Sequence, residues 1–339
     1  MSRPLALVAP DAPSPIPGET VLLGLPIVRR SVLAAGHAGF SPIAVVDGPP
    51  AIRAALSGTP AEFPPSPPAG AVRLPWNAVV AVSDLESLRD GAAGAGVIVA
   101  SAADLSRAER HLLRSLVKDN EGFMSRHFER KVSLAVSRRL AGTPVTPNAI
   151  TLVSVAIGLA GAAFFLRPRA GSETIGALLF LLHSILDGCD GELARLRFQE
   201  SRFGGLLDFW GDNVVHAAVF SAMAAGWSRE TRAPWPLLLG AAAVLGTLAS
   251  AFFVYRRTMG KPRQGPLYTS VATEGETRLS RVADALSRRD FIYLVLILSV
   301  FGKARWFLAL VAVGAPAYFL TLVAIALAER RTAAARSAS

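Results

Sequence analysis

From residue 147 onward the sequence carries apolar runs of about twenty residues, the length that an α-helix needs to cross a bilayer. Inside the hydrocarbon layer every backbone polar group must be satisfied within its own segment, so runs of this kind can fold only as helices. The runs predict an all-α membrane domain with six transmembrane helices, of which the fifth is the shortest: roughly 148–166, 173–195, 204–227, 235–255, 291–302 and 306–328.

The residues before position 104 have a different pattern, in which short apolar runs are broken by Pro and Gly. Strand-like segments at 5–9, 42–48 and 96–101 alternate with helix-like segments at 27–40 and within 77–91. Such alternation is typical of a small α/β unit. The sequence therefore predicts four regions: a cytosolic, Rossmann-like α/β domain at 1–104, an amphipathic interfacial helix at 105–142, the membrane domain at 143–330 and a disordered tail at 331–339.

The formal net charge of the chain is +10. The basic residues flank apolar segments and form no aromatic-interleaved cluster, so the expected partner is the lipid bilayer and not nucleic acid. The apolar run at the N-terminus is short and broken by prolines, unlike a secretory signal. Lys and Arg are more frequent at one set of helix ends, which predicts a multi-pass protein of the cell (inner) membrane with both termini in the cytosol.

Four aspartates interrupt this apolar region. Asp187 and Asp190 lie near the end of the second predicted span, and Asp208 and Asp212 lie near the start of the third. At about 100° per residue, each pair falls on one face of its helix. A carboxylate in a membrane span costs roughly 3 kcal/mol, and Arg195 alone cannot neutralise four of them. A strong compensating interaction is therefore expected at this place.

Divalent cations are the expected compensation. Oxygen ligands suit Mg²⁺, Mn²⁺ or Ca²⁺, and four carboxylates match the charge of two such ions. A pair of metal ions clamps the transferred phosphate in phosphoryl transfer and stabilises charge on the attacking and leaving oxygens. The pattern predicts two divalent cations, with Mg²⁺ as the expected metal and Mn²⁺ as its alternative.

The spacing of these residues resembles the signature of the CDP-alcohol phosphotransferase (CDP-alcohol phosphatidyltransferase) family. The matching string is Asp187-x2-Asp190-Gly191-x2-Ala194-Arg195-x8-Gly204-x3-Asp208-x3-Asp212. The resemblance covers about residues 140–330 and implies a six-helix membrane fold and a homodimer. Members of this family transfer the phospho-alcohol part of a CDP-alcohol, often CDP-diacylglycerol, to the hydroxyl of a second alcohol and release CMP.

The resemblance also implies roles for single residues. The four aspartates would hold the two metals, and Asp212 would in addition accept the proton of the acceptor hydroxyl. The CDP-alcohol pocket would be lined by Asn148, Gly191, Ala194, Arg195, Ser201 and Gly204.

Other polar residues near the membrane region carry weaker predictions. His183 and His216 lie four residues from Asp187 and Asp212, and we expect them to form interhelical hydrogen bonds in preference to binding metal. Four arginines flank a predicted cytosolic loop, where they are either topology signals or ligands of an anionic acceptor: Arg256, Arg257, Arg288 and Arg289.

The order of the segments resembles fusions of an inositol-phosphate cytidylyltransferase with a di-inositol-phosphate-phosphate synthase, in which the front domain makes CDP-inositol. Here the loop after the first strand reads "APDAPSPIPGE", and its prolines leave too few backbone N–H groups to bind a triphosphate. The front domain is therefore predicted to be a degenerate nucleotidyltransferase-like module.

We expect transfer from CDP-diacylglycerol to a polar alcohol such as inositol phosphate or glycerol phosphate. The first alternative is a soluble donor of the CDP-inositol type, transferred to inositol phosphate or to a lipid acceptor. The second, from another class of protein, is a non-catalytic membrane scaffold.

Overall fold

The computed structural model describes residues 3–11, 15–92, 96–117, 128–258 and 291–337, with side chains up to residue 328. The chain divides into two compact units. The front unit comprises residues 1–119, 134–144 and 192–199, and the membrane unit comprises residues 120–133, 145–191 and 200–339.

The front unit is built on a four-stranded parallel sheet in the order β5-β4-β1-β6. Strand β1, one of the two inner strands, is wholly apolar, and its Leu5 and Leu7 are fully buried in the core. A strand that is covered on both faces reads as a continuous apolar run, which is why this segment could be recognised from the sequence. The predicted α/β front domain is confirmed. The strands of the sheet are β1 (Leu5–Val8), β4 (Ile43–Val45), β5 (Ala61–Glu62) and β6 (Val72–Pro75).

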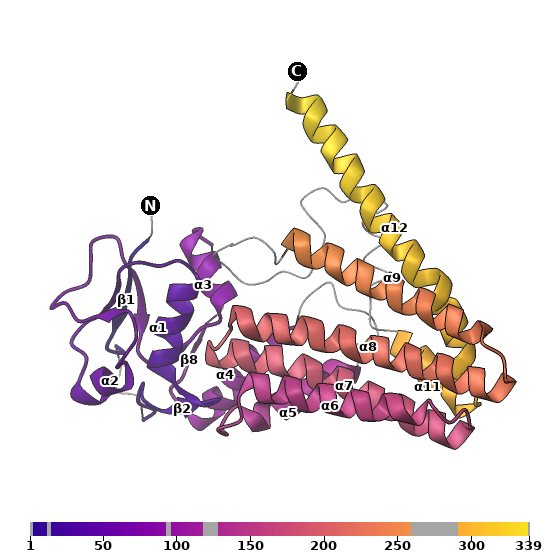
Figure 1. The fold of residues 1–339 in the computed structure, drawn as a ribbon. Helices are drawn as coiled ribbons and strands as arrows, with labels where there is room; N and C mark the ends of the chain where they lie inside the picture. Colours follow the sequence, from indigo (N-terminus) through magenta and orange to yellow (C-terminus); the bar gives the residue numbers. More distant parts are fainter. Residues whose placement is uncertain (1–2, 12–14, 93–95, 118–127, 259–290, 338–339) are drawn as a thin grey trace. The chain divides into compact units, whose positions relative to one another are not determined.

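Two short antiparallel strand pairs and five helices complete the described chain up to residue 140 (Figure 1). Helix α4 starts at the N-cap Ser101, packs on β8, and buries Ala108 and Leu112. The helical segment predicted at 105–142 therefore appears as α4 and a second helix, α5, while residues 118–127 between them lie outside the described part. The elements are β2 (Val21–Leu22), β3 (Leu25–Pro26), α1 (Ile27–His37), α2 (Pro50–Ala55), β7 (Ala78–Val79), α3 (Val82–Arg89), β8 (Val97–Ile98), α4 (Ala102–Ser115) and α5 (Arg130–Leu140).

A buried arginine of α1 binds the end of a helix from the membrane region. The Arg30 guanidinium donates to the carbonyl oxygen of Leu196 at 2.7 Å, and also to those of Leu22 and Leu23 at 2.9 and 3.0 Å. Burial lowers the pKa of Arg30 to about 10, so the group still carries its charge at neutral pH. Leu196 lies in the last turn of its helix, where carbonyl groups have no partner within the helix. Arg30 therefore caps this helix inside the front unit.

The membrane unit contains six helices among its described residues. Four of them, α6, α7, α9 and α12, are long and apolar enough to cross a membrane. Helix α8 is long but carries Asp208 and Asp212, and α11 has only 10 residues. Each segment predicted as a span is thus helical, but six spans are not confirmed. The helices are α6 (Pro147–Phe164), α7 (Ala170–Arg197), α8 (Arg202–Thr231), α9 (Trp235–Thr258), α11 (Phe291–Val300) and α12 (Ala304–Ser337), the last of which runs past residue 331, where a disordered tail is predicted.

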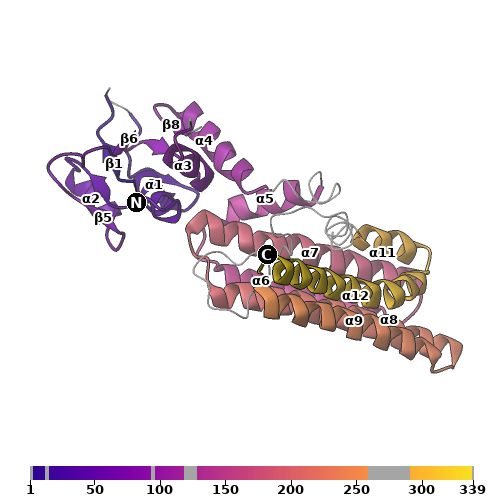
Figure 2. The ribbon, with the colours of Figure 1, turned by 90° about the horizontal axis from the view of Figure 1, so that it is seen from above.

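Helix α8 lies inside this bundle, in contact with α6, α9 and α12 (Figures 1 and 2). Glycines allow the close approach between helices. A Cβ atom on Gly211 of α8 would lie 2.7 Å from Val155 of α6, and one on Gly246 of α9 would lie 2.6 Å from the nitrogen of Pro316 of α12. Side chains any larger would separate these helices. The tight packing holds the polar face of α8 at a fixed place within the unit.

Candidate active site

The four aspartates of the sequence motif lie on two helices of the membrane unit. Asp187 and Asp190 are in the C-terminal half of α7, and each is 4% exposed. Asp208 and Asp212 are in the N-terminal half of α8 and are partly buried, with 25% of the Asp212 side chain exposed. Carboxylates so deep in an apolar bundle require either protons or cations to balance their charge.

The two helices bring Asp187 and Asp212 together. One carboxylate oxygen of each residue, with one ring nitrogen of His183, forms a group whose atoms all lie within 4.8 Å of one another. Ligand atoms on opposite sides of one divalent cation are roughly 4–5 Å apart at ordinary Mg²⁺ and Ca²⁺ bond lengths. This group can therefore hold one cation without a large movement of the helices.

Asp190 is oriented by a residue that the sequence reasoning missed. The Thr151 hydroxyl donates a hydrogen bond to Asp190 Oδ2, and Thr151 is buried on α6. Thr151 lies one turn after Asn148 in the segment "TPNAIT". Its position on the same helix as a predicted pocket residue is the signal that could have identified it. A hydrogen bond of this kind fixes the direction in which a metal-binding carboxylate points.

Three predicted residues of the CDP-alcohol pocket lie together. A Cβ atom on Gly204 would lie 2.9 Å from Asn148 Oδ1 and 3.0 Å from Ser201 Oγ. Ser201 is the N-cap of α8 and accepts a hydrogen bond from the Gly204 amide, while Asn148 is in the first turn of α6. Two helix N-termini therefore meet at Gly204. The dipoles of the two helices make this a favourable place for an anion such as a diphosphate.

The other three predicted pocket residues follow Asp190 along α7. Gly191 is the next residue of the helix and belongs to the membrane unit. Ala194 and Arg195 are half-buried in the last turns of α7, which belong to the front unit. One continuous helix, α7, therefore carries two of the aspartates and these three predicted pocket residues.

The arginines predicted to bind the acceptor lie at and beyond the end of α9. Arg256 and Arg257 are exposed, and each guanidinium covers an aromatic ring of its own helix, at 5.7 Å from Phe252 and 5.8 Å from Phe253. Arg288 and Arg289 lie outside the described residues.

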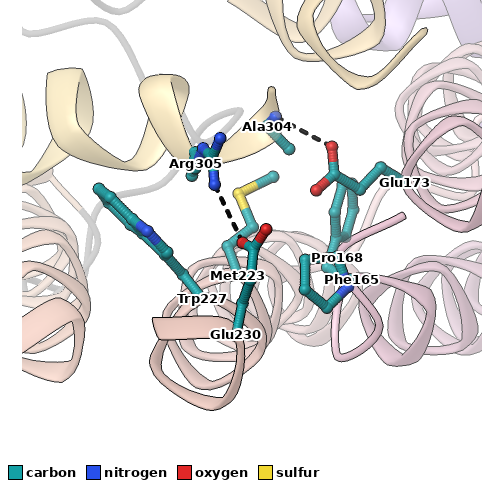
Figure 3. Close-up of a pocket in the computed structure, with 8 residues that line it drawn as sticks. All are labelled: Phe165, Pro168, Glu173, Met223, Trp227, Glu230, Ala304 and Arg305. Atoms are coloured by element: carbon teal, nitrogen blue, oxygen red, sulfur yellow. Dashed lines mark hydrogen bonds and ion pairs between the residues drawn. The ribbon is translucent and has the colours of Figure 1, made fainter. Parts of the chain in front are cut away.

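A small cavity lies at the other end of the bundle (Figure 3). There Glu173 accepts a hydrogen bond from the Ala304 amide at 3.0 Å, and Arg305 pairs with Glu230 at 3.0 Å. The volume of about 10 Å³ suffices for one water molecule. Glu173 precedes Asp187 by a helix rise of roughly 21 Å, so this cavity is separate from the aspartates. It is lined by Phe165, Pro168, Glu173, Met223, Trp227, Glu230, Ala304 and Arg305.

Residues 144–275 match the family model described as CDP-alcohol phosphatidyltransferase. Two similar curated proteins bear the name bifunctional IPC transferase and DIPP synthase. The protein from Thermococcus kodakarensis is 38% identical over 36% of this chain and 27% of its own length, and the protein from Rubrobacter xylanophilus is 35% identical over 53% and 39%. These matches confirm the resemblance carried by the aspartate motif. The chain spans well under half of the length of either relative.

Two further proteins are similar. The phosphatidylinositol phosphate synthase of Corynebacterium glutamicum is 31% identical over 37% of this chain and 56% of its own length. Among solved structures, the phosphatidylinositol phosphate synthase of Mycobacterium tuberculosis with CDP-DAG bound is 19% identical and covers 57% of this chain and 94% of its own, with a TM-score of 0.40.

Proposed function

We propose that the chain, whose residues 144–275 match the family model described as CDP-alcohol phosphatidyltransferase, is a membrane enzyme that transfers a phosphatidyl group from CDP-diacylglycerol to a polar alcohol and releases CMP. The acceptor is a compound such as inositol phosphate or glycerol phosphate. The observation that carries this proposal is the group formed by Asp187 and Asp212 from two different helices. In this proposal the enzyme is a homodimer in the cell (inner) membrane, with six spans and with its site and both termini facing the cytosol.

The proposed cofactors are two divalent cations, Mg²⁺ or Mn²⁺, held by Asp187, Asp190, Asp208 and Asp212. The donor set fits them, because the residues offer carboxylate oxygens and two of the four are almost fully buried. The hydrogen bond from Thr151 to Asp190 supports this assignment, since it leaves the carboxylate fixed in one orientation. When bound, such cations neutralise the pyrophosphate and stabilise charge on the leaving oxygen.

The residues of the chain position the reactants. The N-termini of α6 and α8 bind the diphosphate of the donor beside Gly204, where a Cβ atom would crowd Asn148 and Ser201. An oxygen of the acceptor hydroxyl attacks the phosphatidyl phosphorus, the bond from that phosphorus to the CMP oxygen breaks, and CMP leaves. The Asp212 carboxylate takes the proton of the hydroxyl. In this proposal the basic residues at the end of α9 and in the following segment attract an anionic acceptor: Arg256, Arg257, Arg288 and Arg289.

A soluble donor of the CDP-inositol type is the second candidate. It is favoured by the relatives that are named bifunctional IPC transferase and DIPP synthase. The lipid donor is favoured by the phosphatidylinositol phosphate synthase relative, and by the prolines in the loop that follows β1 of the front domain.

The test is an assay of CMP release by the purified full chain in detergent with Mg²⁺. Each donor is offered with inositol phosphate, glycerol phosphate or no acceptor. We expect CMP release from CDP-diacylglycerol that depends on the acceptor. Release of CMP from CDP-inositol alone would contradict CDP-diacylglycerol as the donor and support the soluble donor instead. A folded protein that releases no CMP from any donor would support the scaffold function and contradict both.

Replacement of Thr151 by valine should weaken metal binding. Valine keeps the shape of threonine but cannot donate to Asp190, so we expect the affinity for Mn²⁺ to fall about 10- to 100-fold, as for other partners of metal ligands. Titration of Mn²⁺ followed by electron paramagnetic resonance measures this affinity. Ser154→Ala is the matched control, because Ser154 is buried one turn later on α6 and donates only to the Thr151 carbonyl among the described contacts. Equal affinities in the two variants would contradict the role of Thr151.

A further inference from the structure

His183 is a buried histidine without a hydrogen bond in the part of the chain that the structure describes. It lies on α7 one turn before Asp187 and is 1% exposed. Neither ring nitrogen has a hydrogen-bond partner among the described residues. The interhelical hydrogen bond predicted for this residue is therefore wrong. A buried polar group left without a partner has lost its hydrogen bonds to water without replacing them, so the position calls for a ligand that the imidazole can bind.

The ring of His183 faces the carboxylates. Its Nε2 atom lies 3.5 Å from Asp212 Oδ1, and the residue belongs to the group whose ligand atoms lie within 4.8 Å of one another. A separation of 3.5 Å is longer than an ordinary hydrogen bond to a carboxylate, but it falls within the roughly 3–4 Å between neighbouring ligands of one metal ion. The arrangement is that of two ligands around a common ion.

Packing holds the ring in this position. The imidazole stacks on Phe180 with 6.2 Å between the ring centres. On the side of α6, a Cβ atom at Gly158 would lie 3.0 Å from His183 Cγ and 2.5 Å from Val215 Cγ1. Glycine at position 158 therefore makes room for both side chains. A ligand whose rotamer is fixed in this way binds a metal with little loss of conformational entropy.

We propose that His183 Nε2 is a nitrogen ligand of the cation held by Asp187 and Asp212, an inference that rests on the function proposed above. This cation site then has mixed nitrogen and oxygen ligands, unlike a site built from carboxylates alone. Imidazole binds Mn²⁺ and later transition metals more readily than it binds Mg²⁺. The mixed site is expected to select Mn²⁺ over Mg²⁺ more strongly than an all-oxygen site does.

His216 provides the matched control. Its Nδ1 atom lies 3.6 Å from Asp212 Oδ2, on the other oxygen of the same carboxylate. Its ring packs among Phe180, Phe220 and Phe291, and it is not part of the group that could hold a metal. Both histidines lie close to Asp212, but of the two only His183 belongs, with Asp187, to the group of described residues that could share a cation.

The test is pulsed electron paramagnetic resonance of Mn²⁺ bound to the purified full chain, which detects nitrogen bonded directly to the metal. We expect a ¹⁴N coupling in the unaltered protein that is lost in His183→Gln and kept in His216→Gln. Labelling histidine with ¹⁵N should convert this signal to the ¹⁵N pattern without any substitution, so the measurement does not depend on the folding of a variant.

Bound Mn²⁺ without nitrogen coupling in the unaltered protein would overturn the assignment, as would a coupling that persists in His183→Gln. The outcomes for the proposed function are separate. Release of CMP without nitrogen coupling contradicts only the role of His183. Nitrogen coupling without CMP release from any donor contradicts only the proposed reaction.

Discussion

Replacement of Asp212 by asparagine is expected to lower the rate of CMP release by about 10²- to 10⁴-fold, the usual contribution of a general base. Asparagine has nearly the same shape as aspartate but cannot accept the proton of the acceptor hydroxyl. The Asp212 carboxylate is a quarter exposed and lies close to the Nε2 atom of His183 and the Nδ1 atom of His216. The rate is to be measured in a single turnover with saturating donor, so that loss of chemistry is distinguished from loss of binding.

Asn213→Ala is the control for this substitution. Asn213 is the next residue of α8, and its amide donates to the Phe209 carbonyl of the same helix at 2.7 Å. Loss of the Asn213 side chain removes one hydrogen bond within α8 but no group of the candidate site. The rate of CMP release should therefore change no more than about twofold. Equal single-turnover rates in the Asp212→Asn and Asn213→Ala proteins would show that Asp212 is not the proton acceptor.

The helices of the membrane unit could be predicted because the bilayer fixes the length of an apolar run. The break predicted between the last two segments, at 303–305, overlaps the observed break only at Lys303, because α11 ends at Val300 and α12 starts at Ala304. The inner strand β1 could also be predicted from its run of apolar residues. The two-residue strands β2, β3 and β7 could not, because pairing over so short a length depends on tertiary contacts and not on local propensity.

The candidate site was predictable where one helix carries the whole pattern. The spacing of Asp187 and Asp190, or of Asp208 and Asp212, puts each pair on one helical face. Thr151 was missed, because its role depends on α6 lying against α7, which the periodicity of a single helix does not encode.

His183 was assigned a hydrogen bond for the same reason, since only the packed structure shows what surrounds its ring. The contact of Arg30 with Leu196 joins residues 166 positions apart, so no local sequence pattern predicts it.

Removal of divalent cations should abolish CMP release and also lower the stability of the protein. Asp187 and Asp190 are 4% exposed, and Asp187 lies with Asp212 in one group of ligand atoms. Without a cation these buried carboxylates repel one another or must take up protons. A cation that binds only the folded state stabilises it by about 2.7 kcal/mol at a concentration one hundred times its Kd. Chelation should therefore lower Tm and activity together, and Mg²⁺ should restore both.

The double variant Asp187→Asn, Asp190→Asn separates a specific site from a general effect of cations on detergent or lipid. It loses two of the four proposed ligands and much of the buried charge, so its Tm should no longer respond to Mg²⁺ and its activity should not return. Cations acting on the lipid surface would shift the Tm of this variant as much as that of the unaltered protein. Activity and Tm that are unchanged by chelation in the unaltered protein would refute the metal site itself, because the fold alone would then tolerate the four carboxylates.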